Sequence, residues 1–279
     1  MSSPLATQSD LPIIRLLNSP SIRNGINAAV PAHIGPDRYI RMVLTCIRTT
    51  PKLATCDQLS MISAIFELAS LGLEPNTPLG HAFLIPYGSK ATVVIGYKGF
   101  VAMANRAGIL IDAEAVYHGD VFDYALGTKA FITHKPCDKP EDRGPIVKAY
   151  AVATWADGRQ RHKVVTQADI ESARSKSASY TRNKKHSAWV TDESAMWIKT
   201  AVRRLATLLP MSAEFARAIQ LDDAAEKGEQ RLVMPDGVML PDSPESSAGE
   251  ADRLAADVRE VSDKEALDDE CYEHKNTEK

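Results

Sequence analysis

The chain has 279 residues, of which 44% are hydrophobic and 25% are charged, the composition of a globular protein with a sizeable core. No stretch reaches the ~18 consecutive apolar residues of a membrane-spanning helix, which argues against a membrane protein. The net charge of −3 hides a segregation: residues 1–221 carry 26 basic and 18 acidic residues, and residues 222–279 carry 7 basic and 18 acidic ones. A basic body followed by an acidic tail predicts a polyanion-binding domain with an interaction segment.

The N-terminal ten residues are polar and lack the apolar segment of a signal peptide. The four cysteines form no CxxC pair, and they are Cys46, Cys56, Cys137 and Cys271. We therefore expect a cytoplasmic protein with reduced thiols.

Residues 1–20 contain three prolines and are predicted to form a flexible N-terminal arm with an apolar portion that docks. Apolar spacing then predicts helices over residues 21–30, from Pro36 onwards, and from the capping Asp57 to the stop at Gly72. The second of these helices has cations off its apolar stripe, which form either a basic surface or an ordinary solvated face: Arg38, Arg41 and Arg48.

The stretch from residue 71 to residue 99, LGLEPNTPLGHAFLIPYGSKATVVIGYKG, predicts a β-hairpin over residues 81–95 that leads into a helix from Tyr97 to Arg106. Tyr97 and Lys98 are bracketed by glycines, which we interpret as permitting a tight backbone bend. An aromatic ring beside a cation suits a nucleic-acid strand, because it offers stacking to a base and a partner to a phosphate.

β-Propensity dominates residues 109–165, where we expect strands over 110–117, 121–125, 129–133, 146–155 and 159–165. Short turns between neighbouring strands predict an antiparallel sheet, so the expected fold class is α+β: a small antiparallel sheet and a β-hairpin packed by helices. A capping box at Thr166 and Asp169 predicts a short helix, followed by a polar loop over residues 175–187. Helices are expected over residues 191–209 and 212–225.

These patterns divide the chain into an arm (1–20), a folded core (21–225) and an acidic, largely disordered tail (226–279). The composition of the tail, rich in Pro, Ser, Asp and Glu, predicts partner interactions rather than a packed core.

Motifs for the common enzyme chemistries are missing. The chain has no GxxxxGK(S/T) loop and no HExxH, and His134 and Cys137 stand three apart without two further ligands. We therefore expect no catalytic residues, no metal site and no cofactor. A metal-dependent nuclease built on Asp112, Glu114, Asp120 and Asp123 is the weaker alternative.

From Arg159 to Arg204 the chain has eleven cations and four acids. Cations placed on phosphates contribute affinity through counterion release, with a salt slope of roughly −0.7 per contact on single strands. The predicted DNA-binding residues, which include the Tyr97–Lys98 pair, are Tyr97, Lys98, Arg161, Lys163, Arg174, Lys176, Lys184, Lys185, Lys199, Arg203 and Arg204.

Three separated stretches resemble the RecT family of single-strand annealing proteins of phages and prophages: LGLEPNTPLGHAFLIPYG, VVIGYKG and WVTDESAMWIKTAVRRLATLLP. The resemblance covers about residues 19–221 and implies an ATP-independent recombinase. Such a protein binds single-stranded DNA, assembles into rings or helical filaments, anneals complementary strands and holds the annealed duplex. The resemblance also implies that the core, residues 21–225, serves annealing and oligomerisation and that its sheet and helices form a basic DNA groove. It also implies a 5′-to-3′ exonuclease that works beside the protein and partner contacts through the C-terminal part. The alternatives for the acidic tail are recruitment of that exonuclease or of a host single-strand-binding protein, shielding of the groove as a DNA mimic, and a solubilising role without a partner.

Within the resemblance, Tyr97 and Lys98 match a Gly-Tyr-basic-Gly element of the family. Arg174 and Lys176 match the basic residues at the entry of a loop. The basic positions of a long helix are matched by Lys199, Arg203 and Arg204. The chain departs from the family in having Ile198 where paired lysines are common, and a longer, more basic loop before Trp189. We expect Lys184 and Lys185 to compensate for the missing lysine. The competing interpretation is a single-stranded nucleic-acid-binding module that neither polymerises nor anneals.

Overall fold

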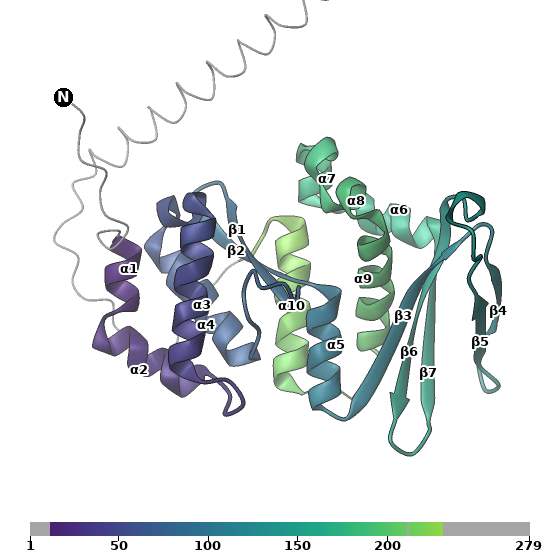
Figure 1. Ribbon diagram of the computed structural model, residues 1–279, viewed down its shortest axis with the longest axis horizontal. Coiled ribbons are helices and arrows are strands. Elements are labelled where there is room, and N and C mark those ends of the chain that lie inside the picture. The colour runs from purple at the N-terminus through teal and green to yellow at the C-terminus, as the bar shows by residue number, and fades with distance from the viewer. Residues whose placement is uncertain (1–11, 211, 231–279) are drawn as a thin grey trace, which may run out of the picture. The chain divides into compact units, whose positions relative to one another are not determined.

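The computed structural model describes residues 12–210 and 212–230 (Figure 1). Its helices are α1 (Pro12–Leu17), α2 (Pro20–Ala29), α3 (Pro36–Thr49), α4 (Gln58–Leu71), α5 (Tyr97–Arg106), α6 (Gln167–Ser175), α7 (Ala178–Arg182), α8 (Ala188–Thr191), α9 (Glu193–Ala206) and α10 (Ala213–Lys227). Its strands are β1 (Ala82–Tyr87), β2 (Lys90–Ile95), β3 (Ile109–Tyr117), β4 (Val121–Ala125), β5 (Phe131–Lys135), β6 (Ile146–Trp155) and β7 (Gln160–Thr166). Of the predicted tail, positions from 231 onwards lie outside the described residues.

The N-terminal helices pack around α4, which is apolar on nearly every side. Asp57 caps α4 by accepting a hydrogen bond from the Ser60 amide at 2.7 Å, and Gly72 ends it with a left-handed φ of 62°. Residues 12–17 of the segment predicted as an arm form helix α1, whose four buried side chains are Ile13, Ile14, Leu16 and Leu17.

Strands β1 and β2 form an antiparallel hairpin in which Ala82 pairs with Ile95 and Tyr87 with Lys90. Its buried face packs on α4 and α10. Three side chains bind the outer edge of β2: Ser60 Oγ accepts from the Ala91 amide at 3.1 Å, Gln230 Oε1 from the Val93 amide at 2.7 Å and Asp222 Oδ1 from the Ile95 amide at 3.0 Å. The predicted hairpin is therefore present and is closed along this edge by side chains.

The largest sheet has the strand order β3-β6-β7 and is antiparallel throughout. On one face of β6, Ala149, Ala151 and Ala153 are fully buried, and their small side chains allow close approach of α9. The other face carries Tyr150, whose ring stacks on Phe122 of the β4–β5 hairpin at a centroid distance of 5.6 Å. The sheet is thus covered by a helix on one face and partly by a hairpin on the other (Figure 1).

The β4–β5 hairpin is fixed to the sheet by the carboxylate of Asp120, whose side chain is fully buried. Arg143 binds this carboxylate with two nitrogens at 2.9 and 3.1 Å, His134 Nε2 lies at 3.1 Å, and the amides of Tyr117 and Cys137 donate at 2.9 and 2.8 Å. The hydrogen bond from Arg143, together with those from the two amides and His134, holds the pKa of Asp120 well below its usual range despite burial. His134 and Cys137 therefore have structural partners here.

The fold class is confirmed as a mixture of helices with small antiparallel sheets. Strand β3 pairs with β6, although β4 and β5 lie between them in the sequence. A prediction that pairs each strand with the next one along the chain misses this pairing. Strand β5 begins two residues later than predicted. The predicted loop 175–187 contains α7 and the 3₁₀ turn Lys184–His186, labelled η4.

The helix predicted over residues 191–209 is interrupted at Asp192, where φ is −136° and ψ is 49°. The carboxylate of Asp192 accepts a hydrogen bond from the Thr191 hydroxyl at 2.7 Å, a local contact that competes with helix continuation. None of the helices in the described part of the chain is both long enough and apolar enough to cross a membrane.

Candidate nucleic-acid interface

The pair Tyr97–Lys98 lies at the first turn of α5, with Tyr97 half-buried and Lys98 exposed. Gly96 has an ordinary φ of −71°, so our interpretation that glycine permits a tight bend here is wrong. The glycines are required for close approach instead, because a Cβ at Gly96 or Gly99 would collide with the carbonyl oxygen of Gly80 or His81. The backbone that carries Lys98 is therefore packed directly on the preceding loop.

Lys199 and Arg203 stand four residues apart on α9 and face α10, where acidic side chains receive them. Lys199 Nζ lies 2.8 Å from Asp222 Oδ1 and 3.8 Å from a Glu226 oxygen, and only 6% of Lys199 is exposed. Arg203 pairs with Asp222 at 3.4 Å, with Glu226 at 2.9 Å and with Asp223. We call these five residues, Lys199, Arg203, Asp222, Asp223 and Glu226, the α9–α10 ion cluster.

The α9–α10 ion cluster links three elements, because Asp222 also accepts the hydrogen bond from the Ile95 amide at the end of β2. One fully buried carboxylate thus joins the strand before the Tyr97–Lys98 pair to the basic face of α9. Burial lowers the pKa of the Arg203 guanidinium, but the carboxylates of Asp222 and Glu226 outweigh burial and raise it overall. Arg203 therefore keeps its charge, and both cations of the cluster are already paired with carboxylates within the protein.

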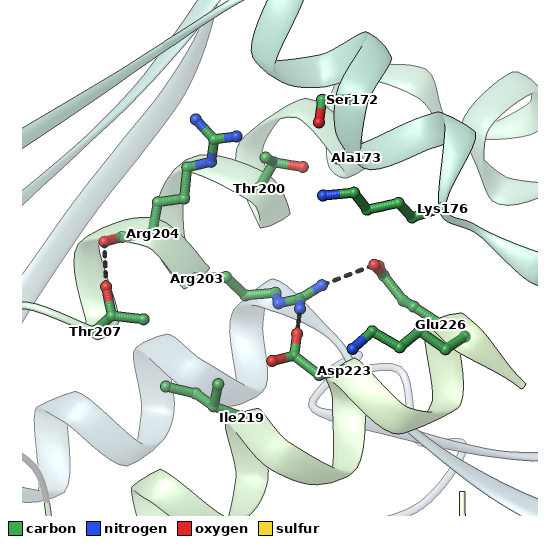
Figure 2. Close-up of a pocket in the computed structure, with 11 residues that line it drawn as sticks. Ser172, Ala173, Lys176, Thr200, Arg203, Arg204, Thr207, Ile219, Asp223 and Glu226 are labelled. Atoms are coloured by element: carbon green, nitrogen blue, oxygen red, sulfur yellow. Dashed lines mark hydrogen bonds and ion pairs between the residues drawn. The ribbon is translucent and has the colours of Figure 1, made fainter. Parts of the chain in front are cut away.

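Beside this cluster, α6, α9 and α10 enclose a cleft of about 300 Å³. Figure 2 shows Lys176 and Arg203 pointing into it, with Asp223 and Glu226 on the α10 side. Thr200 and Ser172 add hydroxyl groups to the lining, and Arg204 and Lys227 add further cations. The cleft brings together three of the predicted DNA-binding residues, Lys176, Arg203 and Arg204.

Arg204 differs from Arg203 in its partner and in its exposure. Its guanidinium lies 2.5 Å from Asp169, and both side chains of this pair remain about one-third exposed. Although burial opposes ionisation of Asp169, hydrogen bonds from the Thr166 amide and from Arg204 lower its pKa. Because Asp169 also completes the predicted capping box at Thr166, Arg204 is held beside the N-terminus of α6.

The segment from Lys176 to His186 carries the cations that are freest on this side of the molecule. Lys176, Lys184 and Lys185 are exposed, and none of them is ion-paired within the described part of the chain. Lys184 Nζ lies 5.4 Å from the centroid of the Tyr180 ring, a cation–π contact. We call this segment, residues 176–186, the exposed basic segment.

Arg174 precedes this segment and is half-buried. It binds Glu193 at 3.1 Å and lies over the rings of Tyr180 and Trp189 at 5.6 and 5.8 Å. Its fixed position orients the exposed basic segment against α8 and α9.

Four predicted residues lie away from the cleft, from the α9–α10 ion cluster and from the exposed basic segment with its neighbour Arg174. Arg161 and Lys163 lie on β7, opposite Ala153 and Ala151 of β6, and carry no ion pair within the described residues. Tyr97 and Lys98 lie at the start of α5. The predicted set therefore divides into the cleft with the adjoining α9–α10 ion cluster, the exposed basic segment with Arg174, β7 and the α5 terminus.

Sequence reasoning missed Lys227 in the cleft, because we assigned it to the tail, and it missed Arg182, which lies 4.5 Å from the Tyr87 ring of the β1–β2 hairpin. It also missed Asp222. Asp222 and Glu226 stand four apart on α10, as Lys199 and Arg203 do on α9, and this matched spacing of opposite charges was the available signal.

The comparisons with known proteins agree with the motifs. The family model described as "RecT family" matches residues 37–234. The chain belongs to the RecT family. "Protein RecT" of Escherichia coli (strain K12) is 37% identical over 221 residues, which cover 76% of this chain and 80% of that protein. "Uncharacterized protein YqaK" of Bacillus subtilis (strain 168) is 23% identical over 257 residues, or 91% of this chain and 87% of that protein.

RecT family membership makes this chain a protein of DNA recombination that binds and anneals single-stranded DNA. The family match covers the β1–β2 hairpin, the three-stranded sheet, the exposed basic segment and the α9–α10 ion cluster. In the described residues, no group of three or more His, Cys, Asp or Glu side chains is arranged to hold a metal ion.

Proposed function

We propose that this RecT family protein anneals complementary DNA strands without ATP, as an oligomeric ring or filament and without covalent catalysis. The observation that carries the proposal is the exposed basic segment, where Lys176, Lys184 and Lys185 have no acidic partner among the described residues. Cations that are not neutralised by the protein are available to phosphates, and each phosphate contact contributes roughly 0.7 to the salt slope of single-strand binding.

The proposed DNA path starts at the cleft and follows the exposed basic segment. Lys176 and Arg204 take phosphates at the cleft, Lys184 and Lys185 take the next ones, and Lys98, Arg161, Lys163 and Arg174 contribute at its margins. Tyr97 is the proposed stacking partner. Lys199 and Arg203 act on the same path by holding α9 and α10 in place, since their charges are already paired.

Annealing in this proposal needs no chemical step. Neutralised phosphates reduce repulsion between two strands, and a strand held by its backbone keeps its base edges available for pairing. Contacts repeated along an oligomer add avidity that one protomer lacks. The acidic tail is proposed to recruit a 5′-to-3′ exonuclease or a single-strand-binding protein, and residues 21–225 to serve annealing and assembly.

The test is annealing of two complementary fluorescent oligonucleotides without ATP, with light scattering of the same mixture. We expect faster annealing together with large DNA-dependent assemblies. Binding without assembly or annealing would instead identify a simple binding module. Metal-dependent loss of the oligonucleotides would identify an enzyme acting on DNA.

A further inference from the structure

A second cationic surface lies on α3, and none of the predicted DNA-binding residues belongs to it. Arg38, Arg41, Thr45 and Arg48 recur at intervals of three and four residues, so they share one face of the helix. The opposite face is buried through Tyr39, Ile40, Val43, Cys46 and Ile47. We call the first face the α3 arginine ridge.

The α3 arginine ridge borders a cleft of about 320 Å³ between α3 and the turn at residues 75–78. This cleft is lined by Arg38, Arg41, Thr45, Thr49, Asn76 and Thr77, among others. The hydroxyl oxygen of Thr77, a residue that lines this cleft, is buried and has no hydrogen-bond partner within the described residues.

Both walls of this cleft are held in place. Arg38 lies 2.9 Å from Glu74, which is itself 8% exposed, and this pair ties α3 to the turn. The Asn76 side chain accepts from the Leu84 amide at 2.7 Å and donates to the Leu84 carbonyl at 3.2 Å, which fixes the turn against β1. The ridge is therefore a preformed surface.

The charge of the ridge is available to a ligand. Arg41 and Arg48 are exposed, and neither is paired with an acid in the described part of the chain. The acidic residue of α3, Asp37, stands one turn before Arg41 and pairs with Arg23 at 3.7 Å. Arg38 to Arg48 spans about 15 Å of helix, so the ridge can contact more than one phosphate of a strand.

The chemistry of the ridge fits a polyanion better than a protein. Guanidinium groups bind phosphate oxygens in a bidentate manner, and protein interfaces are built around apolar residues. None of the large apolar side chains exposed in the described chain lies on α3.

The ridge is distinct from the exposed basic segment. The two share no residue, and Figure 1 shows α3 and α9 on opposite sides of α5 and α10. We propose that the α3 arginine ridge binds the phosphate backbone of the second, incoming DNA strand. This inference rests on the proposed function, because an annealing protein must receive a second strand while a first strand is already bound.

The test compares Arg41→Gln/Arg48→Gln with the control Lys129→Gln/Lys135→Gln, which removes two exposed cations near the β4–β5 hairpin. The first strand is bound to saturation, and binding of a second, non-complementary labelled strand is followed by anisotropy at several salt concentrations. We expect Arg41→Gln/Arg48→Gln to keep first-strand affinity within about twofold and to lower the salt slope for the second strand by about 1.4, or ~0.7 per lost contact. The control should retain the wild-type slope.

Loss of first-strand and second-strand binding together would overturn the assignment, because the ridge would then belong to the first site. An unchanged second-strand slope would overturn it as well. Because the second strand is non-complementary, this measurement does not require annealing, so failure of the ridge and failure of the proposed function are distinguishable.

Photo-crosslinking gives an independent readout. With p-benzoylphenylalanine in place of Thr45, at the centre of the ridge, irradiation should crosslink the second labelled strand. Crosslinks only to protein would overturn the proposal and identify the ridge as a contact with an acidic protein segment. Crosslinks only to the first strand would place the ridge in the first site.

Discussion

The α9–α10 ion cluster and the exposed basic segment are both rich in cations, but they differ in whether those cations are paired with acidic side chains of the protein. Lys199 and Arg203 are enclosed by three carboxylates, whereas Lys184 and Lys185 face solvent without an acidic partner among the described residues. Cations of the first kind stabilise the fold, and removing one partner of a buried pair is strongly destabilising. Cations of the second kind contribute little to stability and are available to DNA.

The largest effect that would sharpen this comparison is that of Lys199→Glu. The new carboxylate would face Asp222 and Glu226, so we expect a loss of at least about 3 kcal/mol in the free energy of unfolding, measured with urea. Lys199→Met/Asp222→Asn should recover part of this loss, because Asn can still accept from the Ile95 amide. Wild-type stability of Lys199→Glu together with lost DNA binding would show that Lys199 contacts phosphate directly.

A buried carboxylate away from both regions provides a reference. Asp120→Asn should lower the free energy of unfolding by about 3 kcal/mol near neutral pH, since it breaks the pair with Arg143. Because the folded-state pKa of Asp120 is depressed, its stabilisation is complete above the ordinary carboxyl pKa of about 4 and is lost as the pH falls below it. The difference between wild type and variant should therefore shrink below about pH 4. A difference that stays constant down to pH 3 would contradict the assigned role.

For the exposed basic segment the expected change is in DNA affinity. Lys184→Glu/Lys185→Glu should lower the salt slope of single-strand binding by at least about 1.4 and leave the unfolding midpoint unchanged. Lys129→Glu/Lys135→Glu, near the β4–β5 hairpin, is the matched charge reversal and should preserve the slope. An unchanged slope in the first variant would remove Lys184 and Lys185 from the proposed path and would end the hypothesis that they compensate for Ile198.

The smallest expected effect concerns Arg204, which is intermediate between the two kinds of cation. Asp169→Asn removes the charge opposite Arg204 but keeps an oxygen for the capping box, so we expect less than about 1 kcal/mol of lost stability. Single-strand affinity should rise about twofold, because Arg204 is released toward the cleft. A fall in affinity, measured by anisotropy, would mean that Asp169 orients Arg204 for binding.

Much of the fold follows from local sequence signals. The helix caps at Asp57 and Gly72, the β1–β2 hairpin and the capping box at Thr166 all depend on a few neighbouring residues, and all are present. The pairing of β3 with β6 brings together segments about forty residues apart, and no local signal specifies it.

The candidate site was harder to predict for the same reason. A lysine that faces DNA and a lysine that faces Asp222 have the same local sequence signature, namely a cation beside an apolar stripe. Only the packing of α10 against α9 separates them. The role of the glycines around Tyr97 and Lys98 likewise depends on the carbonyls of Gly80 and His81. These two residues lie well before the glycines in the sequence, so no rule about local turns predicts the contact.

The side chains along the outer edge of β2 set a practical limit on where the folded core can be cut. The side-chain amide of Gln230 accepts a hydrogen bond from the Val93 backbone amide at 2.7 Å. It also donates to the backbone carbonyls of Val93 and Leu221, both at 2.9 Å. A fragment that ends at residue 225 would lose these bonds and open a strand edge, which is a template for pairing with another chain. A fragment that ends after residue 230 would keep the edge closed, and Gln230 therefore marks the minimal C-terminus for a well-behaved fragment.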